Sequence, residues 1–259
     1  RLVFPDSSLD VIVGPAGAGK TTALAAAYRS WHADQVPVIG TAVAALAARG
    51  LQTRTGIPSV TLTKLLNDLE RIDPRTRRPV GFAHGTIVVV DEASMVDTRS
   101  YARLLDHVSR YGGRLALVGD TEQLPEIEAG GLFATLADDP STIRLTTNIR
   151  QGEEWEREAL TALRDNRPAA ALLAYLHHDR VHIDEARKLP AAITAAYAAT
   201  AADCPLGTVA LASTRREVAA LNTAIRAELV RAGRVDIDGV VVGTPAGSVE
   251  FAAGDVVVI

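Results

Sequence analysis

The stretch Gly14-Pro15-Ala16-Gly17-Ala18-Gly19-Lys20-Thr21 decides the fold of this chain, because it fits the pattern G-x-x-x-x-G-K-[ST] at every position. It lies between residues 9–13, an apolar run that predicts a buried strand, and residues 21–29, which predict a helix. Glycines allow backbone N–H groups to turn toward one anion, and the start of a helix adds partial positive charge. The stretch therefore predicts a phosphate-binding loop.

The same pattern assigns roles to single residues of the loop. The ammonium group of Lys20 is expected to reach the β- and γ-phosphates of a nucleotide, and the hydroxyl of Thr21 to bind Mg²⁺. A chance match that forms an ordinary turn is the alternative, and the flanking strand and helix argue against it. We expect nucleotide contacts from Gly14, Pro15, Ala16, Gly17, Ala18, Gly19, Lys20, Thr21 and Thr22.

Outside the loop, short β-rich apolar runs alternate with Ala- and Leu-rich helical stretches, which predicts an α/β fold with a parallel sheet flanked by helices. Asp138-Asp139-Pro140 interrupts this alternation, so we place a boundary there, between domains 1–139 and 140–259. The expected strands are 36–39, 86–90, 115–118, 142–145, 181–183 and 208–211, and the expected helices are 42–48, 155–164, 189–199 and 215–232. Residues 235–259 contain short β runs separated by Gly and Pro.

Asp91 and Glu92 follow the strand 87–90 directly. Ligands of open α/β sheets bind at the carboxyl ends of the strands, beside the phosphate loop. There Asp91 would hold Mg²⁺, and Glu92 would orient and deprotonate the attacking water. The alternative is helix capping, because acidic residues also favour the first turn of a helix.

Residues 117–125, Leu-Val-Gly-Asp-Thr-Glu-Gln-Leu-Pro, also end a predicted strand. Gln123 can therefore point toward the γ-phosphate edge of the same site. A neutral amide in that place can contact both the phosphate and the attacking water. We predict that Gln123 senses hydrolysis, whereas a glutamine in an ordinary loop would only be solvated.

These motifs together resemble the RecD-like branch of superfamily-one DNA helicases, and in particular the helicase region of TraA/TrwC-type (MobF) conjugative relaxases. The resemblance covers nearly the whole chain. It implies a P-loop NTPase fold with a RecA-like sheet, and a second, incomplete RecA-like domain that ends in the start of a β-rich insertion. The residues that carry it are Gly14–Thr22, Asp91–Asp97, Gly119–Leu124, Glu128–Gly131, Leu145–Gln151, Trp155–Glu158, and Ser213–Val218 with Leu221-Asn222.

The resemblance also implies roles. Gly40–Ala45 and Thr61–Leu66 match family motifs that contact single-stranded DNA, chiefly its phosphates. Thr41 and Thr61 as plain helix caps would be compatible with that role. Arg150 matches the arginine that the family projects across the domain cleft onto the γ-phosphate. The implied activity is ATP hydrolysis, with ATP and Mg²⁺ as cofactors, coupled to 5′→3′ movement on single-stranded DNA.

The ends of the sequence and its composition limit which functions the chain can have. The family's upstream glutamine motif and its later arginine motif are not found, so we expect a piece of a larger protein, monomeric by itself. The net charge of −4 argues against a wholly basic nucleic-acid binder. Cys204 is the single cysteine and predicts a reducing, cytoplasmic location. No stretch has the apolar length of a membrane span.

Two other functions stay open at this point. One is a small-molecule P-loop kinase, which has little need of an Asp-Glu pair together with a glutamine sensor. The other is a nucleotide-binding module without unwinding activity of its own. Residues 71–79, a basic stretch punctuated by proline, are either a solvated loop or a DNA-guiding element. Partners from conjugation or recombination are implied by the resemblance alone.

Overall fold

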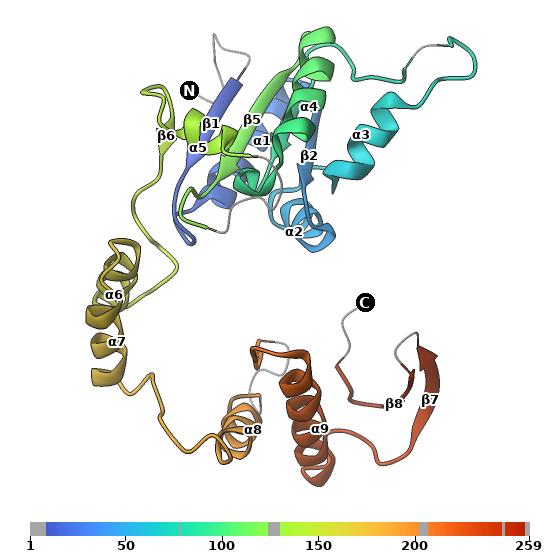
Figure 1. The fold of residues 1–259 in the computed structure, drawn as a ribbon. Helices are drawn as coiled ribbons and strands as arrows, with labels where there is room; N and C mark the ends of the chain where they lie inside the picture. The colour runs from blue at the N-terminus through green and yellow to red at the C-terminus, as the bar shows by residue number, and fades with distance from the viewer. Residues whose placement is uncertain (1–8, 78, 124–129, 202–206, 245–246, 257–259) are drawn as a thin grey trace. The chain divides into compact units, whose positions relative to one another are not determined.

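The computed structural model describes residues 9–77, 79–123, 130–201, 207–244 and 247–256 of the chain (Figure 1). The prediction for Cys204 and the quoted residues 124, 125, 128 and 129 lie outside these ranges. The chain divides into two compact units, Arg1–His178 and Asp179–Ile259. Each unit is described by itself.

A parallel sheet forms the centre of the first unit. Its six strands lie in the order β3-β2-β4-β5-β1-β6, and every neighbouring pair is parallel. The strands are β1 (Leu9–Val13), β2 (Val38–Ala42), β3 (Ser59–Thr61), β4 (Ile87–Val90), β5 (Arg114–Gly119) and β6 (Ile143–Arg144). The predicted α/β fold with a parallel sheet flanked by helices is confirmed.

Helices cover both faces of this sheet (Figure 1). On one face Val88 and Val90 pack with α3 (Leu62–Glu70), α4 (Thr98–Arg110) and α5 (Leu132–Ala137). On the other face Ile87 and Val89 pack with α1 (Lys20–Ala33) and α2 (Ala45–Thr55). Since successive side chains point to opposite faces, a strand buried on both sides is apolar throughout. This explains the uninterrupted Ile-Val-Val-Val of β4.

Helix boundaries differ from the sequence prediction in several places. The helix expected at 42–48 begins only at Ala45 and continues to Thr55, because β2 extends to Ala42. Helices α3 and α4 are not among the predicted helices. Thr61 caps α3, as the capping alternative expects, since its side chain accepts a hydrogen bond from Lys64 N; the Asp97 side chain caps α4 by accepting one from Ser100 N. None of the helices in the described ranges is long and apolar enough to cross a bilayer.

The strand expected to open the second domain joins the first sheet instead. In β6, Ile143 aligns with Ile12, and Arg144 with Val13, in a parallel pairing with β1. The two helices that follow, α6 (Glu154–Arg164) and α7 (Pro168–His177), also belong to the first compact unit. They pack through buried alanines, Ala159, Ala162 and Ala171. The ring of Trp155 stacks on that of His178, with centroids 3.9 Å apart, which favours packing over contact with a base.

The second unit contains α8 (Leu189–Thr200), α9 (Arg215–Arg231) and an antiparallel hairpin of β7 (Gly239–Thr244) and β8 (Gly247–Ala252). The β runs expected near the end of the chain are thus confirmed. The strands expected at 181–183 and 208–211 are wrong, because both segments lack regular structure. Their apolar side chains are largely exposed, with Ile183 at 83% and Leu211 at 84%. A strand needs a neighbouring strand to pair with, and among the described residues of this unit the strand pairing is that of β7 with β8, which includes neither segment.

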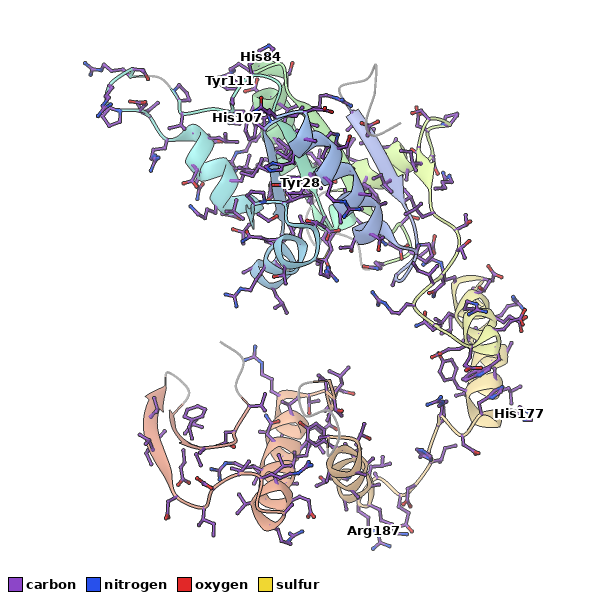
Figure 2. The ribbon with its side chains drawn as sticks, turned by 180° about the vertical axis from the view of Figure 1, so that it is seen from behind. Tyr28, His84, His107, Tyr111, His177 and Arg187 are labelled. Atoms are coloured by element: carbon purple, nitrogen blue, oxygen red, sulfur yellow. The ribbon has the colours of Figure 1, made fainter. Side chains whose placement is uncertain are left out.

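The amino ends of β4 and β5 lie at the sheet edge away from the phosphate loop. Figure 2 shows His84 and Tyr111 there, next to the end of α4. A side chain at Gly112 would meet the His84 ring at 2.8 Å, and Gly112 has a φ of 59°. This turn therefore requires glycine for packing, and the chemistry-bearing residues lie at the opposite, carboxyl edge.

Candidate active site

The phosphate loop starts where β1 ends and is fastened to the neighbouring strand. Gly14 N donates to Gly119 O at 3.2 Å, and Ala18 N donates to Pro15 O at 3.1 Å. Gly17 and Gly19 both have a φ of 83°, in the left-handed region that favours glycine. These turns bring the chain directly into α1, whose N-cap is Gly19. The start of α1 thus lies at the loop, as an anion site requires.

Lys20 is folded back over the loop. Its Nζ donates to the carbonyl oxygen of Gly14 and, at 3.1 Å, to that of Pro15. Burial lowers the pKa of Lys20, while the nearby carboxylates of Asp120 and Asp91 act in the opposite direction. The ammonium group is therefore bonded to neutral carbonyls that a phosphate can replace as acceptors.

Asp91 and Glu92 follow β4 at the same edge. Asp91 N donates to Thr41 O at 2.9 Å, which continues the ladder between β4 and β2. Glu92 has φ 52° and ψ 42°, a left-handed conformation that is uncommon for a non-glycine residue. It precedes the short 3₁₀ helix Ala93–Met95, and its side chain makes no capping hydrogen bond. The capping alternative for Glu92 therefore finds no support.

Burial also perturbs Asp91. It raises the pKa of this carboxyl, and the hydrogen bond from Glu92 N together with the charges of Arg54 and Lys20 offsets part of the effect. A carboxylate that is costly to keep charged by itself gains when a cation binds next to it. Asp91 has the character expected of a metal ligand.

Asp120 comes directly after β5 and is 2% exposed. Arg164 of α6 binds it with two hydrogen bonds of 3.0 Å, one to each carboxylate oxygen. Gln123 Nε2 lies 3.4 Å from Asp120 Oδ2. Burial alone would raise the pKa of Asp120, but the hydrogen bonds from Arg164 and from Glu122 N hold it below its usual value. Asp120 is thus an ionised, fully paired carboxylate beside the loop.

Arg150 reaches the site from the segment that follows β6. Leu145 N donates to Val13 O at 2.8 Å, and Ile149 N donates to Gly17 O at 2.9 Å, so this segment runs along the phosphate loop. Arg150 N in turn donates to Asn148 Oδ1 at 2.9 Å. Arg150 therefore lies beside Gly17 within the first compact unit.

One cavity of about 700 Å³ brings these residues together. All the residues predicted for the site line it except Gly14, which lies behind the loop with its N–H and carbonyl already bonded. The lining residues are Pro15, Ala16, Gly17, Ala18, Gly19, Lys20, Thr21, Thr22, Ala25, Arg54, Asp91, Glu92, Gly119, Asp120, Gln123, Ile149 and Arg150. The cavity thus contains cationic, carboxylate, hydroxyl and amide groups around one phosphate loop.

Sequence reasoning missed three polar residues at or next to this site: Asp120 and Arg54 line the cavity, and Arg164 binds Asp120. Asp120 follows a strand at the same sheet edge as Asp91. Because ligands of open α/β sheets bind at the carboxyl ends of the strands, its position could have been predicted in the same way. Arg54 and Arg164 offered no such signal. They are placed by the packing of α2 and α6, which the local sequence does not determine.

The residues fit a nucleotide with Mg²⁺. The hydroxyl of Thr21 and the carboxylate of Asp91 line the same cavity, and both are the oxygen donors that Mg²⁺ prefers. Left-handed glycines in the loop leave room for close approach of a phosphate. Lys20 also lines this cavity and supplies a positive charge.

The stretches expected to contact DNA lie on β2 and at the start of α3. Thr41 is fully buried, and among the described residues its hydroxyl has no hydrogen-bond partner. Its side chain is thus neither a helix cap nor accessible to DNA; the N-cap of α2 is Ala44. Thr61 does cap α3, since its hydroxyl accepts from Lys64 N at 3.3 Å. In the basic stretch 71–79, Ile72 and Pro79 form an isolated antiparallel bridge, and residues 74–76 form a turn.

Replacing Gly17 by alanine tests the geometry of the loop. Its Cβ would lie 2.6 Å from Arg150 Cβ and from Asn148 Oδ1, in a backbone of φ 83°. We expect Gly17→Ala to weaken binding of a fluorescent nucleoside triphosphate about tenfold or more, because the left-handed conformation alone costs about 1–2 kcal/mol. Fluorescence titration measures the dissociation constant.

Gly85→Ala is the matched control. Gly85 also has a positive φ, 76°, but nothing lies within 4 Å of a Cβ built there. This variant should lose stability and keep the affinity for nucleotide. Equal affinities of the two variants would contradict the role of the Gly17 contact.

Comparisons with known proteins identify relatives of this chain. The conjugal transfer protein TraA of Rhizobium radiobacter is 35% identical over 256 residues, which cover 95% of this chain and 22% of that protein. The TraA protein of Agrobacterium fabrum is 36% identical over 252 residues, with the same shares. The ATP-dependent RecD2 DNA helicase of Deinococcus radiodurans is 34% identical over 150 residues, 55% of this chain and 20% of that protein. The chain spans about a fifth of the length of these relatives.

A family match covers the site itself. Residues 2–186 match the protein family described as AAA domain. This range is well over half of the chain, and it contains the phosphate loop, the Asp91-Glu92 pair, Gln123 and Arg150. The chain belongs to the AAA-domain family.

Proposed function

We propose that this chain is the ATPase core of a DNA helicase motor, from a protein that processes DNA in conjugation. The single observation that carries the proposal is the cavity in which the phosphate loop meets Asp91, Glu92, Gln123 and Arg150. A phosphate loop alone supports only nucleotide binding. A base, a metal ligand, an amide and an arginine around the same phosphate position support hydrolysis.

Each residue has a distinct part in the proposed hydrolysis. The loop N–H groups and Lys20 hold the phosphates, with Lys20 exchanging its carbonyl acceptors for phosphate oxygens. Thr21 and Asp91 would hold Mg²⁺, which would supply neutralisation of phosphate charge when bound. Glu92 accepts a proton from the attacking water, and Gln123 orients that water against the γ-phosphate. Arg150 stabilises the charge that develops on the transferred phosphoryl group.

Coupling to DNA is the second part of the proposal. We assign contacts with single-stranded DNA to the stretches 40–45 and 61–66. Since the Thr41 hydroxyl is buried, backbone N–H groups and the exposed side chains of these stretches would make the contacts. We also propose that a second, incomplete RecA-like domain, expected at 140–259, moves against the first as ATP turns over. Because β6, α6 and α7 belong to the first compact unit, the residues left for this second domain are 179–259. The relatives named as a DNA helicase and as conjugal transfer proteins support a DNA substrate. Movement in the 5′→3′ direction and a cytoplasmic location are further parts of the proposal.

Stimulation by DNA tests the proposed function. We expect single-stranded oligonucleotide to raise ATP turnover at least about tenfold in the complete protein that carries this chain, because a translocating motor hydrolyses ATP as it steps. Phosphate release is measured with single-stranded DNA, with blunt duplex of the same sequence, and without DNA.

Two outcomes would contradict the proposal. Phosphoryl transfer from ATP to a small metabolite, unaffected by DNA, would indicate a P-loop kinase. Nucleotide binding without turnover under any of the three conditions would indicate a binding module that lacks motor activity.

A further inference from the structure

The ion pair between Arg164 and Asp120 is distinct from the other ion pairs of the described residues. Asp120 is the most buried carboxylate among them, at 2% exposed, and both of its oxygens are bound by the guanidinium group. The neighbouring pair Arg167–Asp165 is 59% and 55% exposed. Exposed ion pairs contribute little to the free energy of folding. Loss of one partner of a buried pair, by contrast, leaves an uncompensated buried charge.

Asp120 connects three parts of the site. Its carboxylate accepts hydrogen bonds from Glu122 N at 3.1 Å and from Gln123 Nε2 at 3.4 Å, so it organises the loop that carries Gln123. It also lines the nucleotide cavity and acts electrostatically on Lys20. A carboxylate in this place would repel phosphate and attract the lysine if its charge were unpaired.

Arg164 supplies that pairing from outside the cavity. It is the last residue of α6, 44 residues along the chain from Asp120. The segment that leads to α6 carries Arg150 and is bonded to the phosphate loop through Ile149 N and Gly17 O. Arg164 therefore also fastens the far end of this segment to the sheet edge.

We propose that Arg164 is a positioning residue for ATP binding and hydrolysis: by pairing with Asp120 it keeps that carboxylate from Lys20 and the phosphates, and it holds Gln123 in place. The proposal rests on the proposed function, since it assumes that Lys20 and Gln123 act on ATP. Arg164 itself does not line the cavity. It acts through Asp120, by charge and by the planar two-bond geometry that a guanidinium provides.

Removing the charge on Arg164 should impair nucleotide binding. We expect Arg164→Ala to raise the dissociation constant of a fluorescent ATP analogue at least about tenfold and to lower kcat as well. Arg164→Lys, which keeps the charge but not the two-bond geometry, should lie between this variant and the unmodified chain. Arg167→Ala is the matched control on the same surface and should bind within about twofold of the unmodified chain.

A double variant separates charge from packing. In Asp120→Asn/Arg164→Gln neither partner is charged and both can hydrogen-bond. It should recover affinity to within about threefold of the unmodified chain, since no carboxylate faces the phosphates. A purely structural Arg164 would leave the double variant as weak as Arg164→Ala, and that result overturns the proposal.

Folding and the proposed function are controlled separately. Thermal unfolding followed by circular dichroism is recorded for each variant. If Arg164→Ala does not fold, recovery of affinity in the double variant decides the question. Binding by Arg164→Ala equal to that of Arg167→Ala would overturn the role of Arg164. Absence of Lys20-dependent hydrolysis in the unmodified protein would instead reject the motor function and leave the effect of Arg164 on binding measurable.

Discussion

Lys20→Ala is expected to lower ATP hydrolysis by at least about two orders of magnitude, the effect of removing one preorganised donor from a transition state. The Lys20 ammonium group lies over the phosphate loop, bonded to the carbonyls of Gly14 and Pro15, in a cavity that also holds Asp91 and Glu92. Alanine removes the positive charge that would reach the β- and γ-phosphates. Phosphate release with saturating single-stranded DNA measures the loss.

The loss should not come from unfolding. Burial lowers the pKa of Lys20, which means that the charged form is disfavoured in the folded chain relative to the unfolded one. That destabilising contribution is present at neutral pH, where the unfolded-state lysine is charged. Lys20→Ala should therefore keep the midpoint of thermal unfolding or raise it.

Lys188 provides the matched control for Lys20→Ala. Lys188 is exposed, lies in the other compact unit and pairs with Asp184 and Glu185. Lys188→Ala should hydrolyse ATP at the unmodified rate. Undiminished turnover in Lys20→Ala would show that the phosphate loop is not the hydrolytic site.

Glu92→Gln is expected to separate binding from hydrolysis. The substitution keeps the size of the side chain and removes its ability to accept a proton, and general-base catalysis contributes about 10²–10⁴-fold. We expect kcat to fall by at least about 10², while the dissociation constant for ATP stays within about threefold of its original value. Single-turnover hydrolysis and fluorescence titration measure the two quantities.

The backbone at Glu92 gives this prediction a structural reason. Glu92 lies two residues after the end of β4, has a left-handed conformation with φ 52°, and lines the cavity. Such conformations cost free energy and are found at functional sites. Glu158→Gln, an exposed change on α6, is the control and should leave kcat unchanged. If Glu92→Gln turned over ATP at the unmodified rate, another group would have to be the base.

Local sequence predicted the parts of the site that depend on neighbouring residues in the chain. The phosphate loop is one continuous stretch whose glycines and helix start are visible in order. Asp91, Glu92 and Gln123 were found because each follows an apolar strand, and parallel strands present their carboxyl ends at one edge. These inferences needed no knowledge of helix packing.

Packing decided where the sequence prediction went wrong. The strand at 142–145 looked like the start of a new domain, yet β6 pairs with β1 because that edge of the first sheet was open to it. The segments 181–183 and 208–211 have the composition of strands but take no part in the strand pairing of β7 and β8 in the described residues of their unit. Composition indicates that a strand can form, and a pairing partner decides whether it does.

The sequence by itself therefore determined the phosphate loop, the acidic pair after β4 and the α/β class, because each follows from local pattern and strand period. The tertiary structure alone decided the surroundings of these groups. Arg54 reaches the cavity from α2, and Arg164 meets Asp120 across 44 residues of chain. Such contacts depend on how helices pack on the sheet, and no spacing in the sequence encodes them.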